Sequence, residues 1–227
     1  NDVDLVRCKF ALSAVINPTA FATDGTDLYF LDKANLVRKL GVAAATVTTI
    51  AGTQGSTDIL DGVGGGAHFA GPSGLAFAGG ALYTLDGVLN PNMGLVAPIT
   101  VRRIVLSSRD VKTIAGQVST LGDDDGVGLA AQFSGALYLA TDGVSLFISD
   151  ADGAYSVLAQ GFQPTIRQMT LADNNVTTMI GTRNERTIHN GTGTQAFVNQ
   201  PGPIVFDATT HALVFFDRAE GVFQRLR

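Results

Sequence analysis

The sequence contains one cysteine, Cys8, which excludes a disulfide within the chain. With no CxxC motif and no Cys/His cluster, a thiolate-based zinc site is excluded as well. No uninterrupted apolar stretch approaches the roughly 18 to 20 residues that a membrane helix needs, so membrane insertion is not expected. The net charge of -5 and a pI near 5.0 argue against nucleic-acid binding, because neutralising phosphates requires clustered Lys and Arg.

Glutamate and lysine are scarce in this chain. There are 18 Asp but only two Glu, at Glu185 and Glu220, and 4 of the 15 basic residues are Lys, whereas glycine occurs 27 times. Helices favour Glu and Lys on their exposed faces, and turns favour Gly and Asp. The composition therefore predicts short strands joined by turns, and 227 residues with a 45% apolar content suffice for one large all-β domain or two small ones.

An internal repeat organises the sequence. Residues 47–86, shifted by 64 positions, match residues 111–150 without a gap and share the string Asp-Gly-Val-Gly. A third copy lies at a shift of 129, and a fourth stands at the start of the chain. Each copy divides by periodicity into four β-type runs separated by Gly/Asp turns. In the second copy these runs are Leu75–Ala78, Ala81–Leu85, Thr100–Leu106 and Val111–Ala115.

Each copy is therefore interpreted as a four-stranded antiparallel meander. Such a sheet has two apolar faces that it cannot bury alone, which favours radial stacking of the copies as the blades of a β-propeller. We predict an all-β fold and a single domain over residues 1–227. The expected blades cover approximately residues 18–52, 72–116, 135–181 and 201–227 plus 3–12.

The repeated strings resemble the NHL-repeat β-propellers over essentially the whole chain. The resemblance rests on VTTIAG at 47–52, DGVGGGAHFAGPSGLAF at 61–77, LYTLD at 82–86, VRRI at 101–104 and VKTIAG at 111–116. It implies a propeller fold, in a family that more often has about six blades. Three departures stand out: the first copy lacks the DG-G-A-F segment, the third has GALYLA where P-GLA is expected, and the fourth has NG for DG.

The two ends of the sequence bear on ring closure. The last copy stops at its third strand, Phe223–Leu226, while the run VDLVRCKFAL at 3–12 is β-capable and precedes the first copy. We predict that residues 3–12 pair beside 222–226 and close a monomeric ring of four blades. The rival interpretation is an open fragment or one half of an assembled ring. Because the chain begins at Asn1 without an initiator Met or a charged-then-apolar leader, we expect a processed or trimmed chain. The expected location is extracellular or periplasmic.

The predicted ligand face comprises the loops between blades and the loops between second and third strands, which emerge on one side of a propeller. Two of the latter, 87–100 and 151–164, are longer than common hairpin loops. The face also includes 119–130 and 183–195, where Arg183, Glu185 and Arg186 form a mixed-charge cluster. The candidate ligand-binding residues are Asp58, Asn90, Asn92, Met93, Asp123, Asp124, Gln163, Arg183, Glu185 and Arg186.

Metal and catalytic sites are not predicted from the other polar residues. Asp123 and Asp124 could offer oxygens to Ca²⁺, but Asp125 is the Asp of the recurrent Asp-Gly turn and no EF-hand spacing follows. Zinc-dependent amidating lyases also use this propeller fold, yet the three histidines here, His68, His189 and His211, are not expected to converge. We therefore predict no cofactor, with Ca²⁺ as the alternative.

Two recurrent residue types are expected to serve the fold. Asp32, Asp86, Asp150 and Asp217 end each second strand and should cap backbone amides of the following turn. Arg38, Arg102 and Arg167 recur in the third strands and should bond to nearby carboxylates or carbonyls.

Three classes of function remain open at this point. The first is a non-enzymatic binding or scaffold module that presents its loop face to a protein or small-molecule ligand. The second is a propeller lyase or hydrolase with a metal at the channel mouth. The third is a structural ring that stacks with other domains. A convergent set of His, Glu or Asp on the loop face would favour the enzyme, and the sequence shows acids there without convergent histidines.

Overall fold

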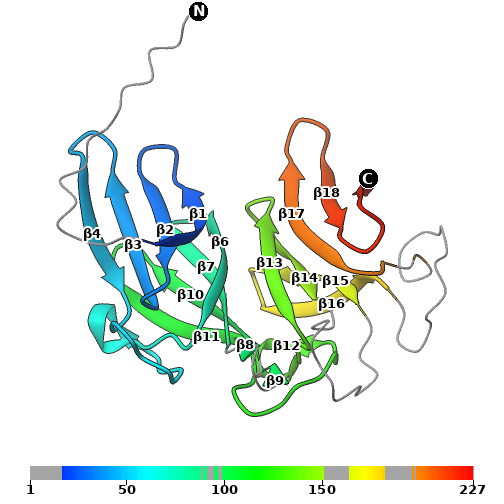
Figure 1. Cartoon of the computed structure of the whole chain (residues 1–227), viewed down its shortest axis with the longest axis horizontal. Helices are drawn as coiled ribbons and strands as arrows, with labels where there is room; N and C mark the ends of the chain where they lie inside the picture. The colour runs from blue at the N-terminus through cyan, green and yellow to red at the C-terminus, as the bar shows by residue number, and fades with distance from the viewer. Residues whose placement is uncertain are drawn as a thin grey trace, which may run out of the picture.

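The computed structural model describes residues 17–87, 89–90, 95–96, 99–150, 164–181, 196 and 198–226. Four antiparallel sheets follow one another along the chain as the four blades of a β-propeller, which confirms the predicted architecture (Figure 1). No helix in the described part of the chain is long and apolar enough to cross a membrane.

Blades 1 and 2 are meanders in which each strand pairs with the next along the chain. The strands of blade 1 are β1 (Pro18–Thr23), β2 (Leu28–Asp32), β3 (Leu36–Gly41) and β4 (Thr46–Ala51). Those of blade 2 are β6 (Pro72–Ala78), β7 (Ala81–Asp86), β10 (Thr100–Val105) and β11 (Asp110–Gly116). The predicted strands of the second copy are thus confirmed to within three residues at each end. The β7–β10 loop carries a further ladder, β8 (Leu89–Asn90) with β9 (Leu95–Val96).

Blades 3 and 4 repeat this order. The strands of blade 3 are β13 (Ala136–Thr141), β14 (Ser145–Asp150), β15 (Thr165–Thr170) and β16 (Asn175–Ile180). Blade 4 has three strands among the described residues: β17 (Pro201–Asp207), β18 (Ala212–Asp217) and β19 (Val222–Leu226). The predicted pairing of residues 3–12 with β19 falls outside the described part of the chain, so closure by that strand stays a prediction.

The segments between blades add short fifth strands that the sequence did not indicate. After β4 the chain pairs β5 (Gly62–Val63) with β11, the outer strand of the next blade, and then makes the 3-10 turn η1 (Gly64–Gly66) before entering β6. The segment after β11 does the same with β12 (Gly126–Val127), which pairs with β16, and η2 (Gly128–Ala130). Each segment therefore fastens the outer edge of the blade that follows it.

The blades pack in chain order. The inner strand β6 lies against both β1 and β13, and β13 lies against β17. We call the face of a blade that points to the preceding blade its leading face, and the other its trailing face. Figure 1 shows blades 1 and 4 at the two ends of this row.

Each interior core joins a trailing face to the next leading face. Between blades 1 and 2 the core contains Tyr29, Leu31, Val37 and Ile50 from the trailing face and Leu75, Leu82, Ile104 and Val111 from the leading face. Between blades 2 and 3 the corresponding residues are Tyr83, Leu85, Val101 and Ile114, and Leu139, Leu146, Met169 and Val176. Between blades 3 and 4 they are Ala140, Phe147, Ile166 and Ile180, and Ile204, Leu213 and Phe215. The alternation of strand side chains thus supplies two apolar faces per blade.

A glycine follows or ends the outer strand of each complete blade, where the chain leaves for the next one. Gly52, Gly116 and Gly181 have φ values of +102°, +80° and +96°. A Cβ on Gly116 would lie 2.4 Å from the carbonyl oxygen of Ile99, and one on Gly181 would lie 2.6 Å from that of Pro164. Close backbone approach and a left-handed conformation together require glycine here.

We expect Gly116→Ala to lower the free energy of unfolding by more than about 2 kcal/mol, because a methyl group adds a backbone clash to the left-handed strain. Gly79→Ala is the matched control, since Gly79 has φ +55° but open space around its Cβ position. The control should lose roughly 1 kcal/mol. Denaturant unfolding of both variants measures the difference, and equal losses would show that the close approach to Ile99 is unimportant.

Candidate functional site

The described part of the predicted loop face, which comprises the segments between blades 1, 2 and 3 and the β8–β9 hairpin, lies on one side of the blade row. The segments that join blade 1 to blade 2 and blade 2 to blade 3 lie with the β8–β9 hairpin along the lower edge of Figure 1, whereas the β1–β2, β3–β4 and β17–β18 turns lie along the upper edge. This follows from the meander order, because every second connection returns to the same side. Asp58, Asp123 and Asp124 lie in the segments between blades, and Asn90 ends β8.

Asp58 and Asp124 differ in their surroundings. Asp58 is 65% exposed, and its Oδ1 lies 2.8 Å from Nδ1 of His68. Asp124 accepts hydrogen bonds at its backbone carbonyl from Arg167 and Gln132, so this loop is fastened to blade 3. Neither Asp123 nor Asp124 is without an interaction partner. The other candidates, Asn92, Met93, Gln163, Arg183, Glu185 and Arg186, lie outside the described residues.

A buried arginine in the third strand of blades 2 and 3 joins two carboxylates. In blade 2 the guanidinium of Arg102 donates to Asp86 at 2.8 Å and to Asp61 at 3.1 Å. It also donates to the carbonyls of Leu60 and His68 and stacks over the ring of Phe69 at 5.1 Å. The predicted structural role of this arginine is confirmed.

Blade 3 contains the same cluster with different residues. Arg167 donates to Asp150 at 3.3 Å and to Asp125 at 2.7 Å, and it stacks over Phe133 at 5.4 Å. Asp125 also accepts from the backbone N–H and hydroxyl of Thr178. The Asp-Gly turn between blades therefore supplies a second carboxylate to the arginine of the next blade, which the sequence analysis did not predict.

The recurrent Asp at the end of each second strand accepts hydrogen bonds from backbone amides, as predicted. The prediction placed these amides in the turn that follows the strand, but in blades 2 and 3 they lie in the segment before the inner strand. Asp32 and Asp217 accept from amides of the turn that follows them. Asp86 accepts from the amides of Ala70 and Gly71, and Asp150 from those of Ser134 and Gly135, which lead into the inner strand of the same blade. These carboxylates thus connect the segment between blades to the core.

Burial governs the protonation of the two inner carboxylates. Desolvation raises the pKa of Asp86 and of Asp150 above the usual aspartate value, against the opposing effect of the arginine and amide partners. Both side chains are fully buried, so they do not reach a ligand at the surface. The two arginine–aspartate clusters therefore have a structural role.

The fourth copy contains the signal that could have revealed this pairing. Gln224 stands at the position of Arg102 in the repeat, and Asn190 stands at the position of Asp61. Both charges are therefore absent together from the fourth copy, as expected if the two residues interact.

We expect Arg102→Met to lower the free energy of unfolding by about 3–5 kcal/mol, because it leaves a buried carboxylate uncompensated. Adding Asp86→Asn should recover part of the loss, since the amide oxygen can still accept from Ala70 and Gly71. The control is Lys112→Met, which removes an exposed pair of 3.9 Å with Asp110 and should change stability by less than about 1 kcal/mol. Denaturant unfolding tests all three. Arg102→Met behaving like the control would contradict a structural role for the cluster.

The histidines are separated among the described residues. His68 pairs with Asp58, and His211 lies at the β17–β18 turn with its ring edge-on to Phe206. His189 falls outside the described residues. Within them, no group of three or more His, Cys, Asp or Glu side chains is placed to hold a metal ion.

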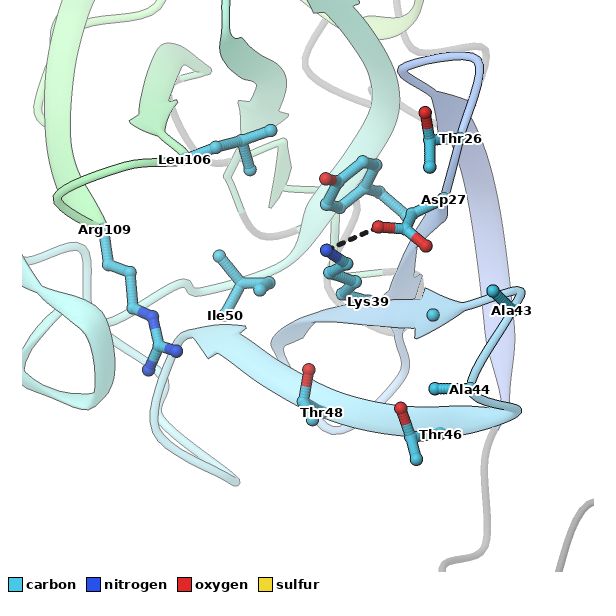
Figure 2. A pocket seen from close by; sticks show the side chains of 12 residues that line it. Thr26, Asp27, Lys39, Ala43, Ala44, Thr46, Thr48, Ile50, Leu106 and Arg109 are labelled. Carbon is cyan, nitrogen blue, oxygen red and sulfur yellow. Dashed lines mark ion pairs between the residues drawn. The ribbon is translucent and has the colours of Figure 1, made fainter.

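A groove of about 580 Å³ lies on the opposite side from the loop face, between blades 1 and 2. It is bounded by the β1–β2 and β3–β4 turns of blade 1 and the β10–β11 turn of blade 2, with Ile50 and Leu106 in its lining. Its polar lining consists of the side chains of Thr26, Asp27, Tyr29, Lys39, Thr46, Thr48 and Arg109. Figure 2 shows Lys39 and Arg109 on either side of Ile50.

The two cationic side chains of the groove, Lys39 and Arg109, differ in their interactions. The ammonium of Lys39 pairs with Asp27 at 2.5 Å and lies 5.9 Å from the ring centroid of Tyr29, while Asp27 also accepts from the backbone N–H of Val42 (Figure 2). Arg109 is exposed, and none of the ion pairs among the described residues involves it. Its backbone is fixed, because its N–H donates to Val105 and its carbonyl accepts from Gly64. The groove therefore has an exposed guanidinium in its lining, carried on a hydrogen-bonded backbone position.

This groove was not predicted from the sequence, because the predicted ligand face lies on the opposite side of the blade row. One signal was available in the sequence, because Arg109 occupies the repeat position of Ala45 and Asn174. In the structure these three residues have left-handed backbone, with φ of +59°, +51° and +58° respectively. A long charged side chain at a strained turn position is unusual for a purely structural turn.

Tyr29 links the groove to the pH dependence of stability. Burial raises its pKa to about 12, and the hydrogen bond from its hydroxyl to Asp24 adds to the shift. The unfolded side chain loses its proton near pH 10, so the folded state retains a proton that the unfolded state releases above that pH. The stabilisation is present below about pH 10 and is lost as the pH rises toward about 12.

We therefore expect Tyr29→Phe to flatten the decline in stability between about pH 10 and 12, although it removes the bond to Asp24 at neutral pH. Denaturant midpoints of both proteins across this range give the comparison. An equally steep decline in the variant would mean that other groups dominate.

Comparisons with known proteins give similarity at the level of fold. No protein-family model and no curated protein matches the sequence. A Bacteroides thetaiotaomicron protein of unknown function shares 21% identity at a TM-score of 0.64, over 91% of this chain and 46% of that one. An auxiliary nutrient binding protein from Bacteroides ovatus shares 17% identity at a TM-score of 0.60, over 92% and 48%. A chain of a nidogen/laminin complex shares 14% at 0.58, over 93% and 60%.

These neighbours support the β-propeller fold, and the chain spans about half the length of the two Bacteroides proteins.

Proposed function

We propose that this protein is a non-enzymatic binding module, of the NHL-repeat type, that takes a small molecule bearing a carboxylate and several hydroxyls in the groove between blades 1 and 2. The observation that carries the proposal is the lining of that groove. Cations and threonine hydroxyls line it together with Asp27, whose carboxylate already accepts from Lys39 and Val42. This set suits recognition, because an engaged carboxylate is a poor general base.

The ligand class follows from the donors. A guanidinium prefers planar anions that accept two parallel hydrogen bonds, which a carboxylate provides. Thr26, Thr46 and Thr48 offer hydroxyls that donate and accept, which suits the hydroxyls of a sugar acid. The likeness to an auxiliary nutrient binding protein agrees with a binding role. The proposal requires no cofactor, and an extracellular or periplasmic location would suit uptake of such a molecule.

The loop face remains a second predicted contact surface, for a protein or small-molecule partner. Its described features are the pair formed by the exposed Asp58 and the half-buried His68, and the β8–β9 hairpin.

Binding of D-glucuronate, with D-glucose as the uncharged comparison, tests the proposal by calorimetry. Arg109→Asn removes the guanidinium while keeping a residue that tolerates left-handed backbone, and it should weaken glucuronate binding by roughly tenfold or more. Lys33→Gln is the matched control, because it removes one exposed positive charge on the other side of the blade, and it should bind like the wild type. Equal affinity for the two sugars, or equal effects of the two variants, would overturn the proposal.

A further inference from the structure

Four residues on the leading face of blade 1 are more exposed than their counterparts in blade 2, whereas Phe30, which pairs with Phe21 on the same face, is only 3% exposed. Phe21, Leu28, Leu40 and Val47 occupy the repeat positions of Leu75, Leu82, Ile104 and Val111. The blade 2 residues are at most 7% exposed because blade 1 covers them. Phe21 is 54% exposed, and the other three are half-buried. The leading face of blade 1 therefore lacks the trailing face of another blade that would cover these residues.

The trailing face of blade 4 is exposed in the same way. Val205, Val214, Phe216 and Phe223 occupy the repeat positions of Ala76, Tyr83, Leu85 and Val101, which are at most 7% exposed in blade 2. Val205 is 58% exposed and Phe223 is 78% exposed, while the rings of Phe216 and Phe223 lie 5.1 Å apart. Two of these four residues are phenylalanines at an uncovered face, which is an unusual placement for large apolar side chains.

We propose that these two end faces bind each other between two copies of this chain, head to tail, so that the pair closes into one ring. The proposed contact continues an interface that the chain already makes three times, because each internal core joins one trailing face to one leading face. One end of the row has the leading face and the other has the trailing face. Two copies related by a two-fold axis would bury both faces of both chains.

A second copy fits these faces better than an unrelated partner does. An unrelated partner would have to match two separated faces of opposite kind, whereas the chain itself carries the complement of each. This chain spans about half of each Bacteroides neighbour, so two copies of its four-blade row together have about the length of one such neighbour. This inference is independent of the proposed ligand groove.

Light scattering coupled to size-exclusion chromatography tests the proposal at micromolar concentration. The wild-type chain should have twice the monomer mass of 23.6 kDa. Phe21→Asp and Phe223→Asp should each weaken dimerisation by roughly tenfold or more, because each places a charge in an apolar contact. Val144→Asp is the control, since Val144 is 69% exposed in the β13–β14 turn, away from both end faces, and it should remain dimeric. Circular dichroism establishes that each variant is folded.

Mixing the two face variants separates a head-to-tail pair from other dimers. A chain with Phe21→Asp keeps its trailing face, and a chain with Phe223→Asp keeps its leading face, so the mixture regains one intact interface. We expect the mixture to dimerise more tightly than either variant alone. In the contrary case only one of the two substitutions would weaken the dimer, and mixing the variants would not restore dimerisation. Such a dimer would join two leading faces or two trailing faces and would overturn the proposal.

Two further outcomes also count against it. A monomeric wild-type chain would overturn the proposal in favour of closure within the chain, for instance by residues 3–12. A ladder of higher oligomers would show that the faces bind without closing a two-copy ring.

Discussion

A four-stranded sheet of this sequence has two apolar faces, and its own strands cannot cover either of them. Side chains alternate along each strand, so Tyr83 and Leu85 point to one neighbour while Leu82 points to the other. Burying these side chains requires a blade on each side, with each buried Leu or Phe contributing about 1.5–3 kcal/mol. Radial stacking follows from this requirement, and so does the exposure of both ends of the row. The groove between blades 1 and 2 is lined by turns of both blades and by Ile50, which belongs to the core that the two blades share.

Stacking alone would leave the connections between blades unfastened. In blades 2 and 3 a cluster of one buried arginine and two aspartates holds the connection in place. Arg102 reaches from a third strand to Asp86 at the end of the second strand and to Asp61 in the preceding segment. The partners of this guanidinium come from segments far apart in sequence, so a single side chain fixes the path of the connection. Because the group is fully buried, its value lies in specifying that path more than in net stability.

The sequence predicted the architecture from period and repeat. Strand limits in blade 2 agreed closely, because Gly and Asp turns mark them. The sequence also predicted structural roles for the recurrent Asp and Arg. It did not predict that Asp61 and Asp125 pair with those arginines, because the pairing spans more than forty positions and depends on β5 and β12 crossing the outer edge of the next blade. The groove was missed for a similar reason: Lys39 and Arg109 come from different blades and meet only after stacking. Six of the ten predicted ligand residues lie outside the described part of the chain and stay predictions.

Amide hydrogen exchange, measured at a dilution where the chain is monomeric, tests most directly whether blades are stabilised by their neighbours. Blades 2 and 3 have covered faces on both sides, whereas blades 1 and 4 each have one uncovered face among the described residues. The account predicts strong protection of the central strands β7 and β14 and faster exchange in β2 and β18. Equal protection of the corresponding strands in all four blades would contradict it.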